Sequence, residues 1–97
     1  MGERLLTILG VNKAGSGTGE TVLGRGKGTC YGGEISCNFP VMSGNGPQAG
    51  QKYVVMVSYN EKGKDWTKTY RDLVCRNPGN AGQGVVFKLK DNDTCPD

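Results

Sequence analysis

The sequence predicts an all-β domain, a small disulfide-stabilised β-sandwich or β-barrel of six to seven short antiparallel strands. Three observations lead to this prediction. Short runs rich in valine and tyrosine alternate with clusters of glycine, asparagine and proline. No 11-residue window carries an apolar stripe at helical spacing. Four cysteines occur in a 97-residue chain that is 35% hydrophobic and has 17 glycines, so cross-links are expected to supplement a small core.

The N-terminal half supplies the first strands and a tight turn. The expected strands are residues 4–11 (RLLTILGV) and 20–23, with a connection of small and polar residues at 12–19 and a glycine-rich break at 24–28. Residues 29–39 (TCYGGEISCNF) predict a hairpin. Gly32 and Gly33 suit its two-residue turn, because such a turn requires positive φ at both positions.

The C-terminal half contains the strongest strand signal. Residues 52–60 (KYVVMVSYN) are rich in Val and Tyr, residues 61–64 suit a turn, and residues 65–75 are the expected partner strand. Residues 84–90 (GVVFKLK) are expected to form the last strand. Alternation along the strands predicts the side chains that fill the core. They are Leu6, Ile8, Ile35, Val55, Val57, Val74, Phe87 and Leu89.

The whole chain, residues 1–97, is expected to form a single domain, because its length suits one small unit. No stretch is long and apolar enough to span a membrane. Residues 1–90 carry all 12 Lys and Arg with 6 acids, whereas residues 91–97 carry three acids and no base. We therefore expect a mildly basic body with an acidic tail. Nucleic-acid-binding surfaces usually concentrate more positive charge than this.

The four cysteines are Cys30, Cys37, Cys75 and Cys95. Their even number in a small chain predicts two disulfides and a secreted, extracellular protein. In the predicted hairpin Cys30 faces Ile35, and Cys37 lies diagonally, roughly 7–8 Å away. Because a disulfide needs Cα atoms within about 6.8 Å, a local bridge is disfavoured. We expect Cys30 and Cys37 to bridge outward, one to Cys75 and the other to Cys95, with both cross-pairings open.

Histidine is absent, which argues against most enzyme classes. Ser-His and Cys-His nucleophilic systems, and most zinc and iron catalysis, need an imidazole. The cysteines also lack the CxxC spacing of many zinc sites. Carboxylate pairs can hydrolyse glycosides, but the carboxylates here occur in charged or turn-like contexts. They are Glu20, Glu34, Glu61, Asp65 and Asp72. The sequence therefore predicts no enzymatic activity, no cofactor and no metal site.

Two long loops, residues 40–51 and 76–84, are the expected contact surfaces, because loops on a cross-linked scaffold vary without unfolding it. The sequence thus predicts a small secreted binding protein of the effector, toxin or inhibitor type, acting on another protein. The contact residues expected in or beside these loops are Phe39, Met42, Asn45, Asn77 and Asn80.

A basic and aromatic surface gives the alternative function, a polyanion- or carbohydrate-binding module. Arg25 and Lys27 lie on a glycine-rich run whose backbone could approach a phosphate, sulfate or carboxylate closely. Trp66, Lys68 and Arg71 would complete the surface, with Tyr59 and Tyr70 near the same hairpin, since aromatic rings stack on bases or sugars. A competing interpretation places Trp66 at one end of the core, which it would seal.

Part of the C-terminal half resembles the Streptomyces subtilisin-inhibitor family of four-cysteine, β-rich protease inhibitors. The resemblance lies in Tyr53-Val54-Val55-Met56-Val57, Trp66, Tyr70, Cys75-Arg76-Asn77 and Val85-Val86-Phe87. It implies that Cys37-Asn38-Phe39-Pro40 forms a loop entering a protease. Pro40 directly after the would-be scissile Phe39, the cysteine spacing and the lack of a helix depart from the family. The chain is therefore not assigned to it.

Overall fold

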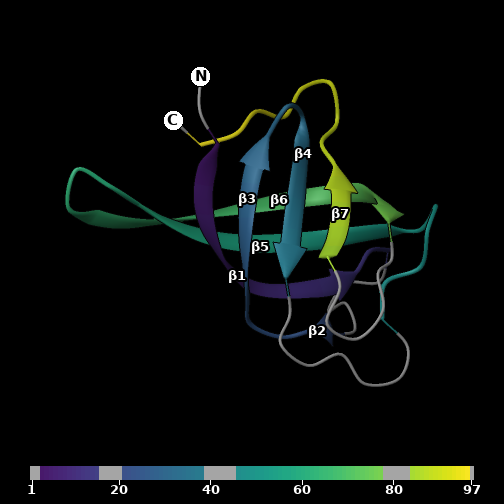
Figure 1. Ribbon diagram of the computed structural model, residues 1–97. Helices are drawn as coiled ribbons and strands as arrows, with labels where there is room; N and C mark the ends of the chain where they lie inside the picture. Colours follow the sequence, from purple (N-terminus) through teal and green to yellow (C-terminus); the bar gives the residue numbers. More distant parts are fainter. Residues whose placement is uncertain (1–2, 16–20, 39–45, 78–83, 97) are drawn as a thin grey trace.

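The computed structural model describes residues 3–15, 21–38, 46–77 and 84–96, and these residues form an all-β fold without a helix (Figure 1). The strands are β1 (Arg4–Lys13), β2 (Thr21–Leu23), β3 (Gly26–Tyr31), β4 (Glu34–Asn38), β5 (Lys52–Glu61), β6 (Lys64–Asn77) and β7 (Gly84–Lys88). The predicted fold class is confirmed. The described residues contain no helix long and apolar enough to cross a membrane.

Six of the strands close into an antiparallel barrel, which decides between the two predicted architectures. The hydrogen-bonded order is β2-β1-β3-β4-β7-β6-β5, and pairing of β1 with β5 closes the ring. β1 makes this closure because its first part pairs with β3 and its second part with β5. The β1–β5 register shifts between Ile8 and Gly10, and such a bulge bends the strand. β2 lies outside the ring, beside the end of β1.

The inner faces of the strands form the core. Tyr53, Val55 and Val57 alternate along β5 with less buried residues, as expected for a strand with one inward face. Phe87 is fully buried, and its ring packs edge-to-face on Tyr53 with 5.9 Å between the two centroids. The core prediction is confirmed for Leu6, Ile8, Ile35, Val55, Val57, Phe87 and Leu89.

Val74 is the exception, because the structure leaves it 38% exposed. Two residues of β6, Arg71 and Asp72, lie opposite a single residue of β5, and Asp72 has a positive φ of 56°. The extra residue shifts the inward–outward alternation by one position. Leu73 and Cys75 are therefore buried, and Val74 points outward. The prediction was wrong here because strict alternation was extended through a bulge.

The hairpin predicted around Gly32 and Gly33 is confirmed, since both glycines have positive φ and Tyr31 pairs with Glu34. The predicted glycine-rich break extended too far, because β3 already begins at Gly26. Gly28 belongs to the strand, and the packing explains why it is glycine. A Cβ at this position would lie 2.9 Å from the Ser36 carbonyl oxygen and 2.9 Å from a side-chain methyl of the β1 isoleucine.

Gly28→Ala is therefore expected to destabilise the barrel by about 1–3 kcal/mol, the usual cost of overpacking. Urea unfolding followed by circular dichroism measures the effect. Gly24→Ala is the matched control, because nothing lies within 4 Å of the added Cβ and its φ is not positive. That control should change stability by less than about 0.5 kcal/mol. Equal unfolding midpoints for the two variants would contradict the close packing at Gly28.

The C-terminal segment, residues 89–96, folds back across one end of the barrel, and we call it the strap (Figure 1). A disulfide joins Cys95 to Cys30 on β3, with a Cα–Cα distance of 5.6 Å. The Arg4 Nε donates a hydrogen bond to the Pro96 carbonyl oxygen at 3.3 Å. Leu89 and Pro96 are buried. Cys95 and Pro96, at the end of the strap, thus lie beside the start of β1 and the end of β3.

The Cys30–Cys95 bond belongs to one of the two predicted cross-pairings, but the expected second bridge is not formed. Cys37 is a buried free thiol. The strands that carry Cys37 and Cys75 are separated by β7. Neighbouring strands lie about 4.8 Å apart, so the Cα atoms of residues two strands apart exceed the roughly 7 Å that a disulfide allows. Burial, with the nearby Cys75, raises the pKa of the Cys37 thiol to about 12.

Candidate functional site

The hairpin of β5 and β6 projects beyond the barrel (Figure 1). Pairing of β5 with β1 ends at Ser58, whereas pairing with β6 continues to Glu61 opposite Lys64. We call residues 59–66 the arm. Its two-residue turn has positive φ at Lys62 and Gly63, a backbone that suits the twist of paired strands.

One face of the arm carries two aromatic side chains. Tyr59 pairs with Trp66, and both continue the face that is buried inside the barrel at Val57. Trp66 is 47% exposed because the arm extends past the barrel end. The interpretation that Trp66 seals the core is therefore wrong. The exposed ring lies instead on a surface that a partner could reach.

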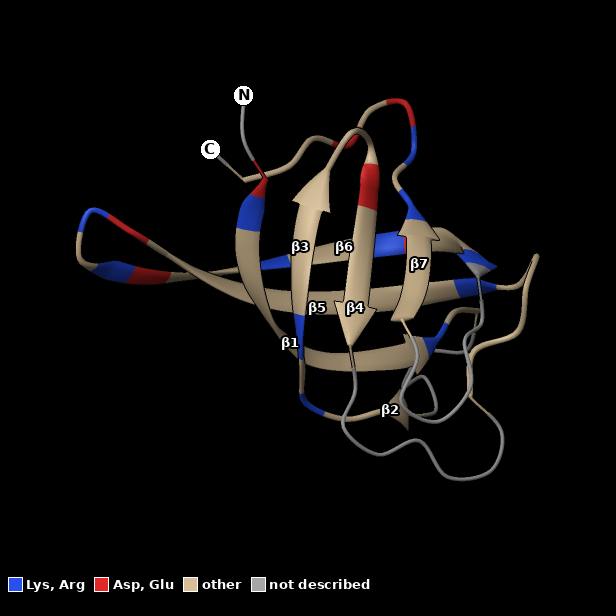
Figure 2. Cartoon of the chain, viewed as in Figure 1, with Lys and Arg blue, Asp and Glu red and all other residues tan. Residues whose placement is uncertain are grey.

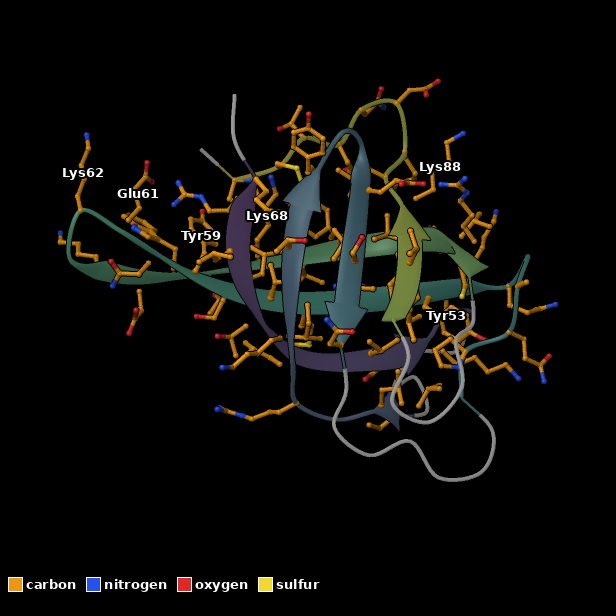
Figure 3. All side chains as sticks on the ribbon, in the orientation of Figure 1. Tyr53, Tyr59, Glu61, Lys62, Lys68 and Lys88 are labelled. Carbon is orange, nitrogen blue, oxygen red and sulfur yellow. A yellow bond between two sulfur atoms is a disulfide. The ribbon has the colours of Figure 1, made fainter. Side chains whose placement is uncertain are left out.

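Arg4, at the start of β1, contacts the β5 strand of the arm. Its guanidinium carbon lies 5.5 Å from the Tyr59 ring centroid, a cation–π geometry. The same guanidinium is 3.8 Å from a Glu61 carboxylate oxygen and donates to the Asn60 carbonyl oxygen at 3.3 Å. Figure 3 shows Tyr59 and Glu61 following one another along the arm toward the Lys62 tip. Arg4 therefore ties the arm to the barrel and leaves Trp66 uncovered.

At the base of the arm, Lys68 and Tyr70 contact the strap. The Tyr70 hydroxyl donates to the Thr94 carbonyl oxygen at 2.8 Å. The Lys68 ammonium lies 5.0 Å from the Tyr70 ring centroid and 3.4 Å from the same carbonyl. Burial, followed by the electrostatic influence of the nearby Asp93 and Tyr59, raises the pKa of Tyr70 to about 12. Tyr70 thus acts as a neutral hydrogen-bond donor at physiological pH.

The raised pKa of Tyr70 predicts alkaline destabilisation. The unfolded phenol ionises from about pH 10, whereas the folded one stays protonated to about pH 12. The contribution of Tyr70 to the free energy of unfolding is therefore constant below pH 10 and falls between these values. Tyr70→Phe removes this titration together with one hydrogen bond, worth about 1 kcal/mol. We therefore expect wild type to be more stable than the variant at pH 8, and we expect the difference in their free energies of unfolding to become smaller toward pH 11. A difference in the free energy of unfolding that does not change with pH in urea titrations would contradict the role of the Tyr70 titration.

A shallow groove of about 500 Å³ lies where the arm meets the outer face of β1, β3 and β4. Leu5, which is 72% exposed, provides its apolar part, and Asp65 accepts a hydrogen bond from the Asn60 side chain at 3.0 Å at its arm side. The remaining lining is largely Ser, Thr and Asn, together with Tyr59 of the arm and the predicted site residue Lys27. The groove therefore extends the contact surface of the arm with small polar groups.

Basic residues occur on several faces of the molecule (Figure 2). Around the arm they are Lys62 and Lys64, with Lys68 at its base. The ion pairs within the described residues are Arg4–Glu61 and Arg76–Glu34, so neither arm lysine is paired there. The arm thus presents Trp66 beside two lysines that form no ion pair within the described residues, while its acids Glu61 and Asp65 contact Arg4 and Asn60 instead.

The structure brings together only part of the predicted site. Trp66 and Lys68 share one face of the β5–β6 hairpin, because residues two apart on a strand point the same way. Lys27 lies on the outer face of β3 opposite Thr7, where it lines the groove beside the arm. Arg25 precedes β3, and Arg71 is exposed at the β6 bulge. Asn77 ends β6. The predicted contacts outside the described residues are Phe39, Met42, Asn45 and Asn80.

Arg4 and Leu5 join this surface although the sequence predictions did not place them in a site, whereas Tyr59 was predicted as part of the aromatic and basic surface. Leu5 and Leu6 are consecutive in β1, so one of them had to face outward, and this signal was available. Tyr59 aligns opposite Trp66 once the turn at 62–63 is assigned. The contact of Arg4 with Tyr59 joins residues 55 positions apart and has no local signal.

The fold and its surface define a small closed antiparallel barrel with a projecting hairpin arm and a disulfide-tied strap. Comparison with protein-family models, curated proteins and solved structures found no match. In the described ranges no cluster of three or more His, Cys, Asp or Glu side chains could hold a metal ion. The geometry of the surface is therefore the basis of the functional proposal.

Proposed function

We propose that this chain is a small extracellular binding protein that docks on another protein through the arm. The observation that carries the proposal is Trp66, nearly half exposed on an element that projects beyond the barrel. Trp, Tyr and Arg are the residues most enriched among those that dominate protein–protein binding energies. Here Trp66 and Tyr59 lie side by side, with Arg4 packed over the tyrosine.

The scaffold supports this role because it holds the arm rigidly. Arg4 ties the arm to β1, and the Tyr70 and Lys68 contacts tie its base to the strap. A preorganised surface loses less conformational entropy on binding than a free loop does. The Cys30–Cys95 disulfide is compatible with an oxidising, extracellular compartment. The loops predicted from sequence would then be additional contacts, and they stay a prediction.

A screen of wild-type protein against an array of extracellular proteins, followed by surface plasmon resonance on each hit, tests the proposal. Trp66→Ala should weaken binding about 30-fold, because a dominant interface residue contributes at least about 2 kcal/mol. Met56→Ala is the matched control, since Met56 is also exposed on β5 but faces away from the arm aromatics. Hits that bind Trp66→Ala as tightly as wild type would contradict the proposal.

Polyanion binding predicts a different result with the same variants. A polyanion surface would make retention of wild type on heparin strongly salt-dependent, and Trp66→Ala would weaken that retention only by the stacking contribution of one ring. Dispersal of the basic residues over several faces gives that function less support than the arm gives to protein binding.

A further inference from the structure

β6 has a free edge along the arm and its base. β6 spans Lys64–Asn77, but its pairing with β7 begins only at Val74. Among the described residues, residues 64–73 pair with β5 alone, and no backbone hydrogen bond from a loop or from the strap reaches them. Barrel closure removes most strand edges from a fold. This edge is therefore a distinct feature of the surface.

The register of the hairpin determines which backbone groups face outward. In a two-residue hairpin, the residues that flank the turn form a hydrogen-bonded pair, here Glu61 and Lys64. Every second residue of β6 then bonds to β5, and the residues between them direct N–H and C=O toward the free edge. Those residues are Asp65, Thr67 and Thr69, all exposed. They offer the bonding pattern that an added strand requires.

The side chains beside this edge specify the kind of strand. Lys64, Trp66 and Lys68 lie on one face at two-residue spacing, so they present an alternation of positive, aromatic and positive groups. On the other face, Asp65 and Thr67 favour small uncharged neighbours. Lysines on a free edge also disfavour pairing with a second copy of the same edge.

We propose that this edge binds an extended acidic segment of the partner protein as an added β-strand. The segment places acidic residues beside Lys64 and Lys68 and an apolar residue beside Trp66. Backbone hydrogen bonds from residues 65, 67 and 69 supply the pairing, as in other cases of strand addition. This inference rests on the proposed function and names the partner chemistry of the same surface.

Two synthetic heptapeptides of identical composition test the alternation. Ser-Glu-Thr-Leu-Thr-Glu-Ser places both acids on the lysine face in either strand direction, and Glu-Ser-Thr-Leu-Thr-Ser-Glu moves them to the other face. NMR titration of ¹⁵N-labelled protein should show saturable shifts at the amides of Asp65, Thr67 and Thr69 for the first peptide. We expect about tenfold weaker binding for the second. Equal binding of the two peptides, or shifts that avoid these amides, would overturn the proposal.

Substitutions on the edge separate backbone from side-chain effects. Thr67→Pro removes an outward N–H without removing a bond to β5, so peptide binding should be lost, whereas Thr67→Ala should bind within about twofold of wild type. Lys64→Glu, which leaves the backbone unchanged, should weaken binding of the first peptide and abolish its preference over Ser-Lys-Thr-Leu-Thr-Lys-Ser, because a negative charge at position 64 then opposes the positive charge of Lys68. This variant keeps the proposal testable if the proline variant does not fold. Unchanged charge preference in Lys64→Glu would overturn the proposal.

Other occupants of the edge give distinct results. Broadening of the Thr67 and Thr69 amides without peptide, together with a dimer in sedimentation, would assign the edge to a second copy and overturn the proposal. Binding of heparin fragments but not of the first peptide would do the same in favour of a polyanion. If Trp66→Ala weakens the binding of a partner found by array screening and Thr67→Pro does not, the proposed function is supported and the proposal of strand addition is overturned.

Discussion

Replacing Cys30 and Cys95 together by serine is expected to lower the free energy of unfolding by about 4 kcal/mol. The disulfide joins residues 65 positions apart, and closing a loop of this length removes that much unfolded-chain entropy. Small domains are stable by only about 5–15 kcal/mol, so the variant should lie close to its unfolding threshold. Urea unfolding measures the loss, and the slope of the transition should rise because the unfolded chain becomes more expanded.

A reductant provides the matched control. It should destabilise wild type and leave the double-serine variant unchanged, since the variant has no Cys30–Cys95 bond to reduce. Peptide mapping checks the pairing, because cleavage after Glu34 separates Cys30 from Cys37. A cross-linked peptide that joins Cys37 instead of Cys30 to Cys95 would contradict the barrel register. A wild-type unfolding midpoint that complete reduction does not change would contradict the predicted contribution of the disulfide to stability.

Phe87→Ala should have an effect of similar size, about 3–5 kcal/mol, because it removes a fully buried aromatic side chain and leaves a cavity. Phe87 lies on β7 between Ile35 of β4 and Cys75 of β6, so its ring packs at the centre of three adjacent strands. Thermal and urea unfolding measure the loss. Val86→Ala, one residue away on the outward and partly buried face, should cost less than about 1 kcal/mol.

Comparing the stability losses of Phe87→Ala and Val86→Ala tests which residues of β7 face the core. Similar losses in both variants would mean that the strand is not buried on one side only. A large loss at Val86 with a small loss at Phe87 would place the register of β7 one residue away from that described here, because a one-residue slip exchanges the two faces.

Local signals in the sequence predicted much of the barrel wall. Alternation along β5 and β7, and the two glycines of the β3–β4 turn, depend on residues that are neighbours in the chain. The sequence does not distinguish a sandwich from a barrel, because closure of the barrel depends on one strand, β1, pairing with two strands that are far apart in sequence. The Val74 error has the same origin, since the bulge at Asp72 is set by pairing with β5.

The candidate site was predicted only in part. Trp66 and Lys68 were identified from residue type, but their position on a projecting arm depends on where the β1–β5 pairing ends. The contact of Arg4 with Tyr59 requires the two ends of the fold to meet, and no sequence window contains both. The basic set of Arg25, Lys27 and Arg71 was grouped by charge. In the structure Lys27 lines the groove beside the arm, whereas Arg25 precedes β3 and Arg71 lies at the β6 bulge.

Fluorescence of Trp66 tests the exposed arm most directly, because it is the only tryptophan in the chain. Emission of the native protein should lie near that of free N-acetyltryptophanamide, and acrylamide should quench it readily. Addition of a partner found by array screening should shift the emission to the blue and reduce the quenching. Blue-shifted native emission that resists acrylamide would place Trp66 in the core and contradict the arm as a binding surface.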